Sequence, residues 1–532
     1  MCGIFSVLSK NTKLNIHEIM SSYEAGKNRG PEQSKINLIK ENIIFGFHRL
    51  AINGVKDITS MQPFNLKQCV LICNGEIYNW KKLYKTMGEL PTTGSDCEVI
   101  IHAYRKYGIT HTLQILDGVF AFILYDKENG NIFIARDTYG IRPLFISSDE
   151  DKYLIASEMK SLINIPYRKN KARQFTPGTC IKINLEKNIE QLFSFSHCNS
   201  FTNYNITNEK DAMFAIKHSL INAVKKRVDN TDRDITCLLS GGLDSSLIAA
   251  LVRKITKNKE LHTWSIGMKG SEDLKYAKIV ADYIGSTHHC IELEEKEFLE
   301  AIESVIYDTE TYDTTTVRAS VGNWLISKYI NENSDAKVVF NGDGSDEVCG
   351  GYMYFHLAPD PLEFDKECRR LLNDIHYFDV LRSDRSISSH GLEARTPFLD
   401  RSFVQTYLSI PPEIRYHPKD GKCEKYLLRN AFENMDLLPR EILFRTKEAF
   451  SDGVSKQTRS WFEIIQEYIV SKGGEKYSNM EPKAAEKQFY MDIFDKYYPG
   501  HRDIIPYLWM PKYVDADDAS ARTLNIYKNK MN

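Results

Sequence analysis

Short apolar or alternating runs, separated by turn residues such as Asn-Gly and Asp-Gly, fill the first part of the chain. Runs of this length and spacing are typical of β-strands. Two stretches, residues 16–26 and 97–107, carry helical spacing instead. Because the strands follow one another with only these interruptions, we predict an α+β region with antiparallel sheets layered with helices. The expected strands are residues 43–52, 69–73, 120–125, 131–136, 153–156 and 179–185.

The pattern changes near residue 195. Residues 194–208 are polar and show little periodicity, so we expect a linker at residues 196–208. Beyond it, apolar residues recur at four-residue spacing from Ala212 to Val224, and strands and helices then alternate. This alternation predicts a doubly wound parallel sheet, which binds ligands beyond the carboxyl ends of its strands. The expected strands are residues 235–239, 261–267, 288–293 and 337–340, and the expected helices are residues 245–255, 274–284 and 298–307.

These patterns divide the 532 residues into two domains. The first is α+β and covers residues 1–195, and the second is α/β and covers residues 209–532, with a mostly helical part after about residue 360. The length agrees with this division, because a single hydrophobic core stops growing near roughly 250–300 residues.

Composition and charge exclude several classes of protein. Hydrophobic residues make up 42% of the chain and charged residues 26%, as in ordinary globular proteins. The net charge of −2 gives no basic surplus, so we expect no nucleic-acid partner. The sequence contains no run of about 18 apolar residues, so we expect no membrane-spanning helix.

The eleven cysteines are scattered, without a CxxC pair or the spacing of a zinc site. This usage is typical of free thiols in a reducing compartment. The N-terminus lacks the basic segment and small-residue cleavage site of a signal peptide. We therefore expect a cytoplasmic protein.

Cys2 follows the initiator methionine, and removal of Met1 would give it a free α-amine. A thiol attacks as the thiolate, and its ordinary pKa is about 8.5. An α-amine, with an ordinary pKa of about 7.7–8.0, can accept the thiol proton near neutral pH. Cys2 could then supply both the nucleophile and the base. Taken alone, a cysteine at position 2 is more often without such a function.

Several motifs accompany Cys2 within roughly the first 190 residues. They are Arg29-Gly30-Pro31, His48-Arg49-Leu50, Asn74-Gly75-Glu76-Ile77-Tyr78-Asn79, Thr93-Gly94-Ser95-Asp96 and Arg136-Asp137-Thr138-Tyr139-Gly140. Together with Cys2 they resemble the glutaminase domain of the N-terminal-nucleophile amidotransferases. The resemblance implies that Cys2 attacks the side-chain amide of glutamine.

The same resemblance implies a glutamine site in which each residue type suits its task. Arg49 would hold the glutamine carboxylate through a bidentate pair. Glu76 and Asp96 would hold the ammonium group, and Asn53 belongs to the same site. Asn74 and the backbone N–H of Gly75 would donate to the tetrahedral oxyanion. An Asn-Gly pair alone is more typical of a hairpin turn.

A glycine-rich loop follows the expected strand at residues 235–239 and opens a helix. It reads Ser240-Gly241-Gly242-Leu243-Asp244-Ser245-Ser246. Backbone N–H groups at a glycine turn and a helix N-terminus bind anions, although the Gly-Lys-Ser/Thr ending of a Walker A loop is missing. Because a carboxylate among phosphates needs a bridging cation, Asp244 implies Mg²⁺. The loop resembles the pyrophosphate-binding loop of ATP pyrophosphatases.

An acidic segment follows the expected strand at residues 337–340, so it should reach the same sheet edge. It reads Asn341-Gly342-Asp343-Gly344-Ser345-Asp346-Glu347. By itself it is typical of a solvated acidic loop, and the spacing of an EF-hand is absent. Opposite a nucleotide loop, its carboxylates make sense as Mg²⁺ ligands and substrate-orienting groups.

A glutaminase followed by an ATP pyrophosphatase resembles the glutamine-hydrolysing asparagine synthetases, over almost the whole chain. The resemblance includes Glu310-Thr311-Tyr312-Asp313-Thr314-Thr315, Gly391-Leu392-Glu393-Ala394-Arg395, Lys447-Glu448-Ala449-Phe450 and Trp509-Met510-Pro511-Lys512. It implies that ATP adenylates the side-chain carboxylate of aspartate and that ammonia from glutamine attacks the β-aspartyl-AMP. The products would be asparagine, AMP, pyrophosphate and glutamate. Relatives are often homodimers, and the implied ligands are glutamine, aspartate, ATP and Mg²⁺.

The resemblance also assigns the residues of the nucleotide site. Lys425 would neutralise phosphate charge as a point charge, although an exposed lysine is the commoner case. Asp343 would help to form the intermediate. The residues expected around ATP are Leu239, Ser240, Gly241, Gly242, Asp244, Ser245, Ser246, Ile266, Asn341 and Gly342, with Asp244 and Asp346 at the metal positions.

One segment departs from the family. Members usually read Ser-Gly-Glu-Gly where this chain has Asn341-Gly342-Asp343-Gly344. Asp343 is one methylene shorter than glutamate, and a displacement of about 1 Å can cost ~10²-fold in rate. Asn341 replaces a small hydroxyl beside the adenine. These differences predict an effect on rate more than on reaction type.

Three other interpretations were weighed against this one. A related amidotransferase or β-lactam-forming ligase would use another carboxylate acceptor, but β-lactam formers need no glutaminase. A catalytically impaired paralogue predicts erosion at Cys2 or the nucleotide loop, and only Asp343 points that way. A nucleic-acid-binding module is opposed by the charge balance.

Overall fold

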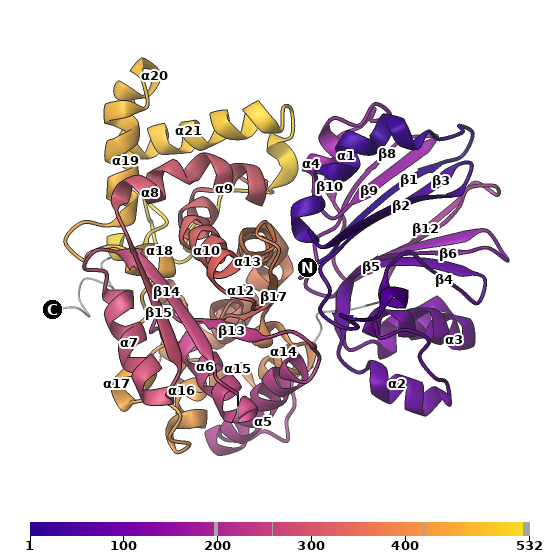
Figure 1. The fold of residues 1–532 in the computed structure, drawn as a ribbon. Coiled ribbons are helices and arrows are strands. Elements are labelled where there is room, and N and C mark those ends of the chain that lie inside the picture. The colour runs from indigo at the N-terminus through magenta and orange to yellow at the C-terminus, as the bar shows by residue number, and fades with distance from the viewer. Residues whose placement is uncertain (196–200, 258, 419–420, 525–532) are drawn as a thin grey trace.

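The computed structural model describes residues 1–195, 201–257, 259–418 and 421–524. A region of antiparallel sheets and a region built on a parallel sheet lie side by side, and the N-terminus lies between them (Figure 1). The predicted α+β and α/β fold classes are both confirmed.

Two antiparallel sheets of six strands form the described N-terminal region and pack face to face. Side chains alternate along each strand, so Val70 and Ile72 of β5 enter the core between the sheets while Leu71 and Cys73 face outward. In spatial order the first sheet is β10 (Arg173–Gln174), β8 (Phe145–Ser148), β9 (Lys152–Ala156), β1 (Gly3–Ser9), β3 (Ile43–Arg49) and β2 (Gln33–Lys40). The second is β12 (Ile189–Ser194), β11 (Thr179–Asn184), β7 (Asn131–Arg136), β6 (Gly118–Asp126), β5 (Cys69–Ile77) and β4 (Phe64–Leu66).

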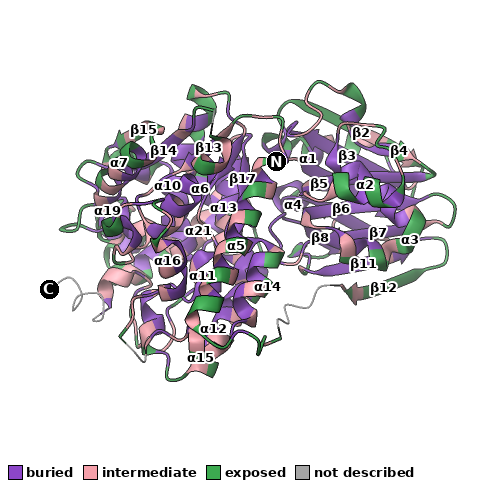
Figure 2. Ribbon diagram, turned by 90° about the horizontal axis from the view of Figure 1, so that it is seen from below, coloured by how far each residue is buried: buried purple, intermediate pink, exposed green. Residues whose placement is uncertain are grey.

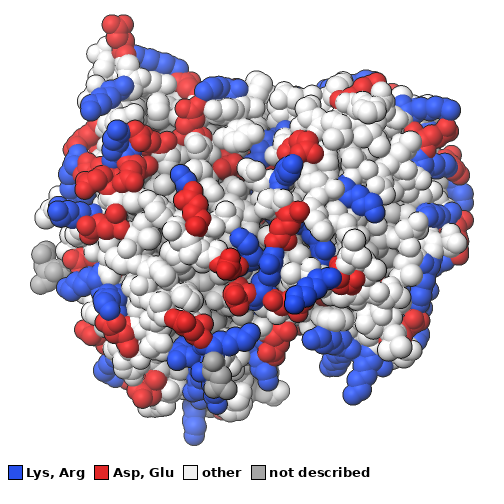
Figure 3. All heavy atoms as spheres, viewed as in Figure 1, with Lys and Arg blue, Asp and Glu red and all other residues white. Residues whose placement is uncertain are grey.

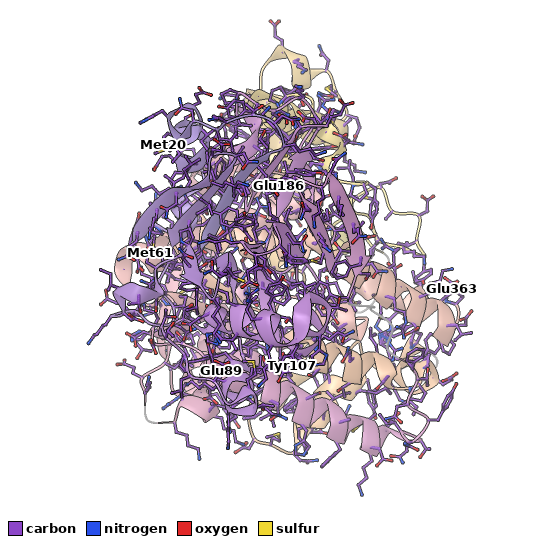
Figure 4. All side chains as sticks on the ribbon, turned by 90° about the vertical axis from the view of Figure 1, so that its right-hand side faces the viewer. Met20, Met61, Glu89, Tyr107, Glu186 and Glu363 are labelled. Atoms are coloured by element: carbon purple, nitrogen blue, oxygen red, sulfur yellow. The ribbon has the colours of Figure 1, made fainter. Side chains whose placement is uncertain are left out.

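Helices cover the outer faces of both sheets. α2 (Trp80–Met87) and α3 (Val99–Ile115) pack on the second sheet. α1 (Met20–Glu24) and α4 (Lys160–Ile163) pack on the first. Met20 therefore lies at the opposite end of this region from Glu89 and Tyr107, with the sheets between them (Figure 4).

Each strand predicted in this region is present, although β1, β2, β4, β8, β10 and β12 were not predicted. The strand expected at residues 43–52 ends at Arg49. The helix expected at residues 16–26 is a 3₁₀ turn, Ile16–Ile19, followed by α1. The helix expected at residues 97–107 continues to Ile115 beyond a kink at Gly108, where φ is +75°.

The C-terminal region is built on a parallel sheet of five strands. The chain moves outward from β13 in one direction and then returns to its other side, so the strand order reverses between β13 and β16. Ligands bind at such a reversal. In spatial order the strands are β15 (Thr287–Leu293), β14 (His262–Met268), β13 (Ile235–Leu238), β16 (Val338–Phe340) and β17 (Glu393–Arg395).

Helices lie on both faces of this sheet, as expected for a doubly wound fold. α5 (Glu209–Val228), α6 (Leu243–Thr256) and α7 (Glu272–Ile284) share a core with one face. α10 (Thr314–Asn333) and α13 (Asp379–Ser388) share a core with the other. The predicted strands are present with bounds shifted by one residue, whereas the helix expected at residues 298–307 is two helices, α8 (Glu295–Glu300) and α9 (Ile302–Thr309). The mostly helical part includes α11 (Ser345–Cys349), α12 (Pro361–Asp374), α14 (Arg401–Ser409), α15 (Pro412–Arg415), α16 (Tyr426–Glu433), α17 (Arg440–Leu443), α18 (Phe450–Gly453), α19 (Trp461–Lys472), α20 (Glu475–Ser478) and α21 (Pro482–Tyr497).

The connection between the regions is short and irregular where it is described. Residues 196–200 of the expected linker lie outside the described residues, and residues 201–208 form neither helix nor strand. Asn208 then caps α5, because its side chain accepts from the backbone N–H of Asp211. The sequence signal for a linker therefore ends at the residue that starts the first helix of the second region.

The two regions share buried apolar surface. Leu50, Val119 and Ile141 of the first region join a core formed mostly by the second, and buried residues fill the sheets of both (Figure 2). Lys and Arg side chains are interspersed with Asp and Glu over the described face in Figure 3. Across the described residues, no helix combines the length and hydropathy that a membrane span needs. All ten described cysteines are free thiols.

Candidate functional site

Cys2 lies at the start of β1, at the junction of the two regions. The Sγ of Cys2 is 3.5 Å from the carbonyl oxygen of Leu50. The Nε of Arg29 donates to the carbonyl oxygen of Cys2 at 3.0 Å. Burial raises the pKa of the Cys2 thiol to about 11 in the chain that retains Met1. Burial also lowers the pKa of the Met1 α-amine to about 5. Both values describe the chain before Met1 is removed, in which Cys2 has no free α-amine.

Arg49 is the last residue of β3 and is buried. Its guanidinium donates to the carbonyl oxygen of Gly54 at 2.8 Å and to the side chain of Gln33 at 3.1 Å. Among the described residues, no carboxylate forms an ion pair with it. Arg49 thus keeps an unneutralised charge that a ligand carboxylate can pair with.

Asn74 and Gly75 lie in the middle of β5. Both polar atoms of the Asn74 side chain are buried without a hydrogen-bond partner in the described structure, and the residue is 1% exposed. Leaving a buried polar group unpaired costs about 1–3 kcal/mol, which a bound ligand would relieve. A Cβ on Gly75 would lie 2.6 Å from the carbonyl oxygen of Val119, so a side chain does not fit there.

Glu76 and Asp96 are buried together, and both regions hold them. Asn53 donates to Glu76 at 2.9 Å from the first region. From the second region, Asn230 donates to Glu76 at 2.8 Å and to Asp96 at 3.1 Å. Arg395, at the end of β17, lies 3.2 Å from Glu76. Burial raises the pKa of both carboxyl groups, so these cationic and amide donors are needed to keep them ionised.

The glycine-rich loop lies between β13 and α6. Gly241 has a φ of +73°, and a Cβ there would lie 2.5 Å from the backbone N of Ala277. Close approach of α7 therefore requires glycine. α6 begins without a side-chain cap after Gly242, so its first N–H groups are left for another acceptor.

A cavity of about 180 Å³ opens at this loop, at the carboxyl ends of β13 and β16. Leu239 and Ile266 give it an apolar wall that suits an adenine ring. Gly241 and Ser246 lie behind the wall, since the first packs on α7 and the second is fully buried. The other predicted residues of this site line the cavity: Leu239, Ser240, Gly242, Asp244, Ser245, Ile266, Asn341, Gly342, Asp343, Asp346 and Lys425.

A buried lysine joins the two acidic segments in the cavity. The Nζ of Lys425 lies 2.6 Å from Asp244 and 2.7 Å from Asp346. Burial would raise the pKa of Asp346, but Lys425 and Lys447 outweigh it and hold that pKa below its usual range. Lys425 has a φ of +57°, a left-handed conformation that is strained for a non-glycine residue and that clusters at functional sites. It is 2% exposed, so the surface-lysine interpretation is wrong.

Lys447 was not predicted as a site residue. Its Nζ lies 2.7 Å from Asp346 and 3.9 Å from Asp244. In the described ranges, no three His, Cys, Asp or Glu side chains gather into a metal site of their own. Mg²⁺, however, is commonly bound by one or two carboxylates with substrate phosphates, and the Asp244–Asp346 pair fits that donor set.

Acidic side chains line another part of the cavity. The hydroxyl of Tyr352 donates to Glu347 and, at 3.3 Å, to Asp379. Burial, together with the negative charge of Asp379, raises the pKa of Glu347. Arg382 lies 2.8 Å from Asp379 and 3.1 Å from Asp343. The cavity thus combines a cationic wall for phosphates with an acidic wall that suits an ammonium group.

Comparison with known proteins agrees with this geometry. The family described as "Glutamine amidotransferase domain" matches residues 1–207, and the family described as "Asparagine synthase" matches residues 215–364 and 357–518. The "Asparagine synthetase [glutamine-hydrolyzing]" of Mus musculus is 43% identical, with 99% of each chain covered. That of Homo sapiens is 43% identical, with 100% of each chain covered. This chain belongs to the glutamine-hydrolysing asparagine synthetase family.

The solved structure titled "Structure of the allosteric regulatory enzyme of purine biosynthesis" is also similar, at 17% identity and a TM-score of 0.33. It covers 55% of this chain and 80% of that one, and so low a score supports no conclusion. The predicted resemblance to glutamine-hydrolysing asparagine synthetases, in contrast, is confirmed over the full chain.

Sequence reasoning missed several residues at the two candidate sites, among them Asn230, Arg395 and Lys447, and also Asp379 and Arg382 of the cavity. Arg395 and Lys447 belong to motifs quoted for the family, so their presence was visible but their contacts were not. Asn230 lies in no motif. No local signal could have found it, because its two acceptors are more than a hundred residues away in the sequence.

Proposed function

We propose that this chain makes asparagine from aspartate, using ATP and ammonia released from glutamine. The names of its relatives state asparagine synthesis and glutamine hydrolysis for them. One observation carries the proposal. One part of the chain holds Cys2 and Arg49, which has no carboxylate partner among the described residues. Another part of the same chain holds the Asp244–Lys425–Asp346 cluster at the end of a parallel sheet. A carboxylate is a poor electrophile at pH 7, so amide formation needs the activation that ATP supplies.

At the glutaminase site, we propose that Cys2 attacks the glutamine amide after removal of Met1. The α-amine of Cys2, freed by that removal, takes the thiol proton. Arg49 pairs with the glutamine carboxylate, and Glu76, Asp96 and Asn53 form the site of its ammonium group. Asn74 and the Gly75 N–H donate to the oxyanion of the tetrahedral intermediate. The unpartnered Asn74 side chain supports this role.

At the synthetase site, we propose that the aspartate side chain attacks the α-phosphate of ATP. Leu239, Ile266 and the backbone at Asn341-Gly342 contact the adenosine, and the loop from Ser240 to Ser246 holds the pyrophosphate. Lys425 and Lys447 neutralise the charge that develops on the leaving pyrophosphate. Mg²⁺, held by Asp244 and Asp346 with phosphate oxygens, would neutralise charge at the same place.

The acceptor aspartate would lie against the acidic wall of the cavity. Glu347 and Asp379 provide the negative potential that its ammonium group needs, and Arg382 links Asp379 to Asp343, which lines the same cavity. Asp343 helps to form the β-aspartyl-AMP. Ammonia then attacks this intermediate and releases AMP.

We further propose that residues 1–195 are the glutaminase domain, residues 196–208 the linker and residues 209–532 the synthetase domain. The protein acts in the cytoplasm on small molecules only, with no nucleic-acid or membrane partner, and forms a homodimer. The interspersed surface charges and free thiols support the first part of this proposal.

The test is an assay on the full chain with a C-terminal tag, so that Cys2 stays free. Aspartate, glutamine, ATP and Mg²⁺ are supplied, and asparagine, AMP, pyrophosphate and glutamate are measured together. Equal amounts of asparagine, AMP and pyrophosphate support the proposal. Glutamate without pyrophosphate would instead mean an active glutaminase on an impaired synthetase, or one that takes another carboxylate acceptor.

A further inference from the structure

Asp343 is held at both of its carboxylate oxygens. The side-chain amide of Asn341 donates to Oδ2 at 2.8 Å, and Nη2 of Arg382 donates to Oδ1 at 3.1 Å. The Asn341 amide nitrogen also lies 2.7 Å from the hydroxyl of Ser383, and its oxygen accepts from the Asp343 backbone N–H at 3.4 Å. Asn341 therefore uses both ends of its amide on one neighbour and on α13.

These contacts change the role expected for Asn341. The residue lines the cavity, but its polar atoms are spent on Asp343 and Ser383 rather than left for a base. It is 3% exposed, so the amide has little freedom to turn away. Its backbone, with Gly342, is what approaches the nucleotide loop: a Cβ on Gly342 would lie 2.7 Å from the Cβ of Asp244.

We infer that Asn341 is a positioning residue. It fixes the carboxylate of Asp343 at the place that the carboxylate of a glutamate, which is one methylene longer, would reach by itself. Serine at 341 could reach neither the carboxylate nor Ser383 in the same way, because its hydroxyl ends closer to the backbone. Glutamate at 343 would push its carboxylate into the space that the Asn341 amide and Arg382 already fill. Positions 341 and 343 thus form a matched pair, and this inference rests on the proposed function of Asp343.

The alternative is that Asn341 only fills space beside the nucleotide. The two roles separate in kinetics, because a positioning residue acts on kcat whereas a residue that contacts adenine acts on the KM for ATP. They also separate in coupling. Residues in direct contact give non-additive effects in a double-mutant cycle, and independent residues do not.

The test compares four full-length chains: wild type, Asn341→Ser, Asp343→Glu and the double variant. Aspartate-dependent pyrophosphate release is measured with ammonium chloride as the nitrogen source, so that the glutaminase site is not involved. We expect each single variant to lose ~10–100-fold in kcat, as for a displacement of about 1 Å, with a small change in the KM for ATP. The double variant should recover most of the loss.

A matched control is Asn184→Ser, at a buried asparagine of the second antiparallel sheet whose side-chain amide donates two hydrogen bonds and accepts one. It should leave pyrophosphate release unchanged, which separates positioning from the general cost of losing a buried amide. Multiplicative losses in the double variant, or a raised KM for ATP at unchanged kcat in Asn341→Ser, would overturn the inference.

A second measurement keeps the inference apart from the proposed function. If the wild type released no pyrophosphate with aspartate, the proposed function would fail. The hold of Asn341 on the Asp343 carboxylate would still be testable by thermal unfolding. The changes in melting temperature should then be non-additive. The double variant should lose less than the sum of the losses in the two single variants. Additive changes in melting temperature would reject this contact between Asn341 and Asp343 as a positioning interaction, whatever the activity assay shows.

Discussion

The two candidate sites differ in which part of the chain completes them. Among the described residues, the cavity of the synthetase site is lined only by residues from Leu238 onward. The acidic pair of the glutaminase site, in contrast, takes Asn230 and Arg395 from the other region. Glutamine binding should therefore depend on the state of the synthetase region, whereas nucleotide binding needs nothing from the glutaminase region.

The difference does not mean that the sites are remote. The backbone N–H of Asn341, in the nucleotide cavity, donates at 3.2 Å to the carbonyl oxygen of Arg395, whose side chain reaches Glu76. β17 ends at Arg395, and its neighbour β16 ends one residue before Asn341. One edge of the parallel sheet thus contacts both sites. We expect the dependence of glutamine binding on the synthetase region to involve this edge.

The largest effect should come from Cys2→Ala, which removes the proposed nucleophile of one site and leaves the other complete. We expect glutamine-dependent asparagine formation to fall by at least ~10³-fold, since no covalent step remains. Formation from ammonium chloride should stay near the wild-type rate. Cys290→Ala, at an exposed thiol, is the matched control and should change neither rate. Loss of both activities would contradict the independence of the synthetase site.

The next effect is expected from Lys425→Ala, which removes the ammonium group between Asp244 and Asp346. Removal of an electrostatic group of this kind typically costs ~10²–10³ in kcat, measured as pyrophosphate release. Glutaminase activity should be nearly unchanged. Lys422→Ala, three residues away at a partly exposed ion pair with Glu209, controls for the loss of a lysine. An equal loss of glutaminase activity would show that the synthetase site is not self-contained in its effects.

Asn230→Ala tests the dependence in the other direction. Glu76 and Asp96 would lose a shared donor, and a hydrogen bond to a charged group is worth about 1.5–3 kcal/mol, or ~10–100-fold in KM for glutamine. Because the loss raises the pKa of both carboxyl groups further, the KM should rise most at low pH. Asn184→Ala serves as the control, and ammonia-dependent synthesis should be unaffected. An unchanged KM for glutamine would mean that the synthetase region does not complete the glutaminase site.

The smallest effect concerns pH and Asp273, which lines the nucleotide cavity. Burial raises the pKa of its carboxyl group to about 7, against the partial compensation of Arg445. Between its ordinary pKa of 3.8 and about 7, the folded chain therefore binds more protons than the unfolded chain at this group. Stability from this group is greatest at low pH and is lost as the pH rises through that interval.

Asp273→Asn should remove this dependence. The free energy of unfolding of the wild type, minus that of the variant, should fall by on the order of 1 kcal/mol for each pH unit between about 4 and 7. Denaturant unfolding at several pH values measures it. A flat difference would mean that Asp273 is ionised throughout, held by Arg445 at 3.2 Å.

Local signals made part of this molecule predictable. The glycine-rich loop needs only a strand, a tight turn and a helix, and each leaves its mark within a dozen residues. α10, however, buries the polar residues Thr316, Arg318, Ser320 and Asn323 as well as the apolar row Val317, Val321 and Leu325, so its helical pattern is less distinct in the sequence. β17 is three residues long and carries two charged side chains, which opposes any prediction of a buried strand.

The site was predictable to the same extent. Residues in sequence motifs were proposed for the two sites, whereas residues that join those sites only through tertiary contacts were not. Asn230 and Lys447 illustrate the limit, because each acquires its role only when a segment more than a hundred residues away folds against it. The hold of Asn341 on Asp343 needed side-chain geometry, although both positions were visible as departures from the family.

The short strand β17 has a consequence for aggregation. A strand at the margin of a sheet presents unpaired backbone groups that other chains can pair with. Here all three of its residues are buried, and the glutaminase region lies against it, because Arg142 pairs with Glu393 at 3.2 Å. A fragment beginning at residue 209 would expose that margin, so the glutaminase region also shields its neighbour from self-association.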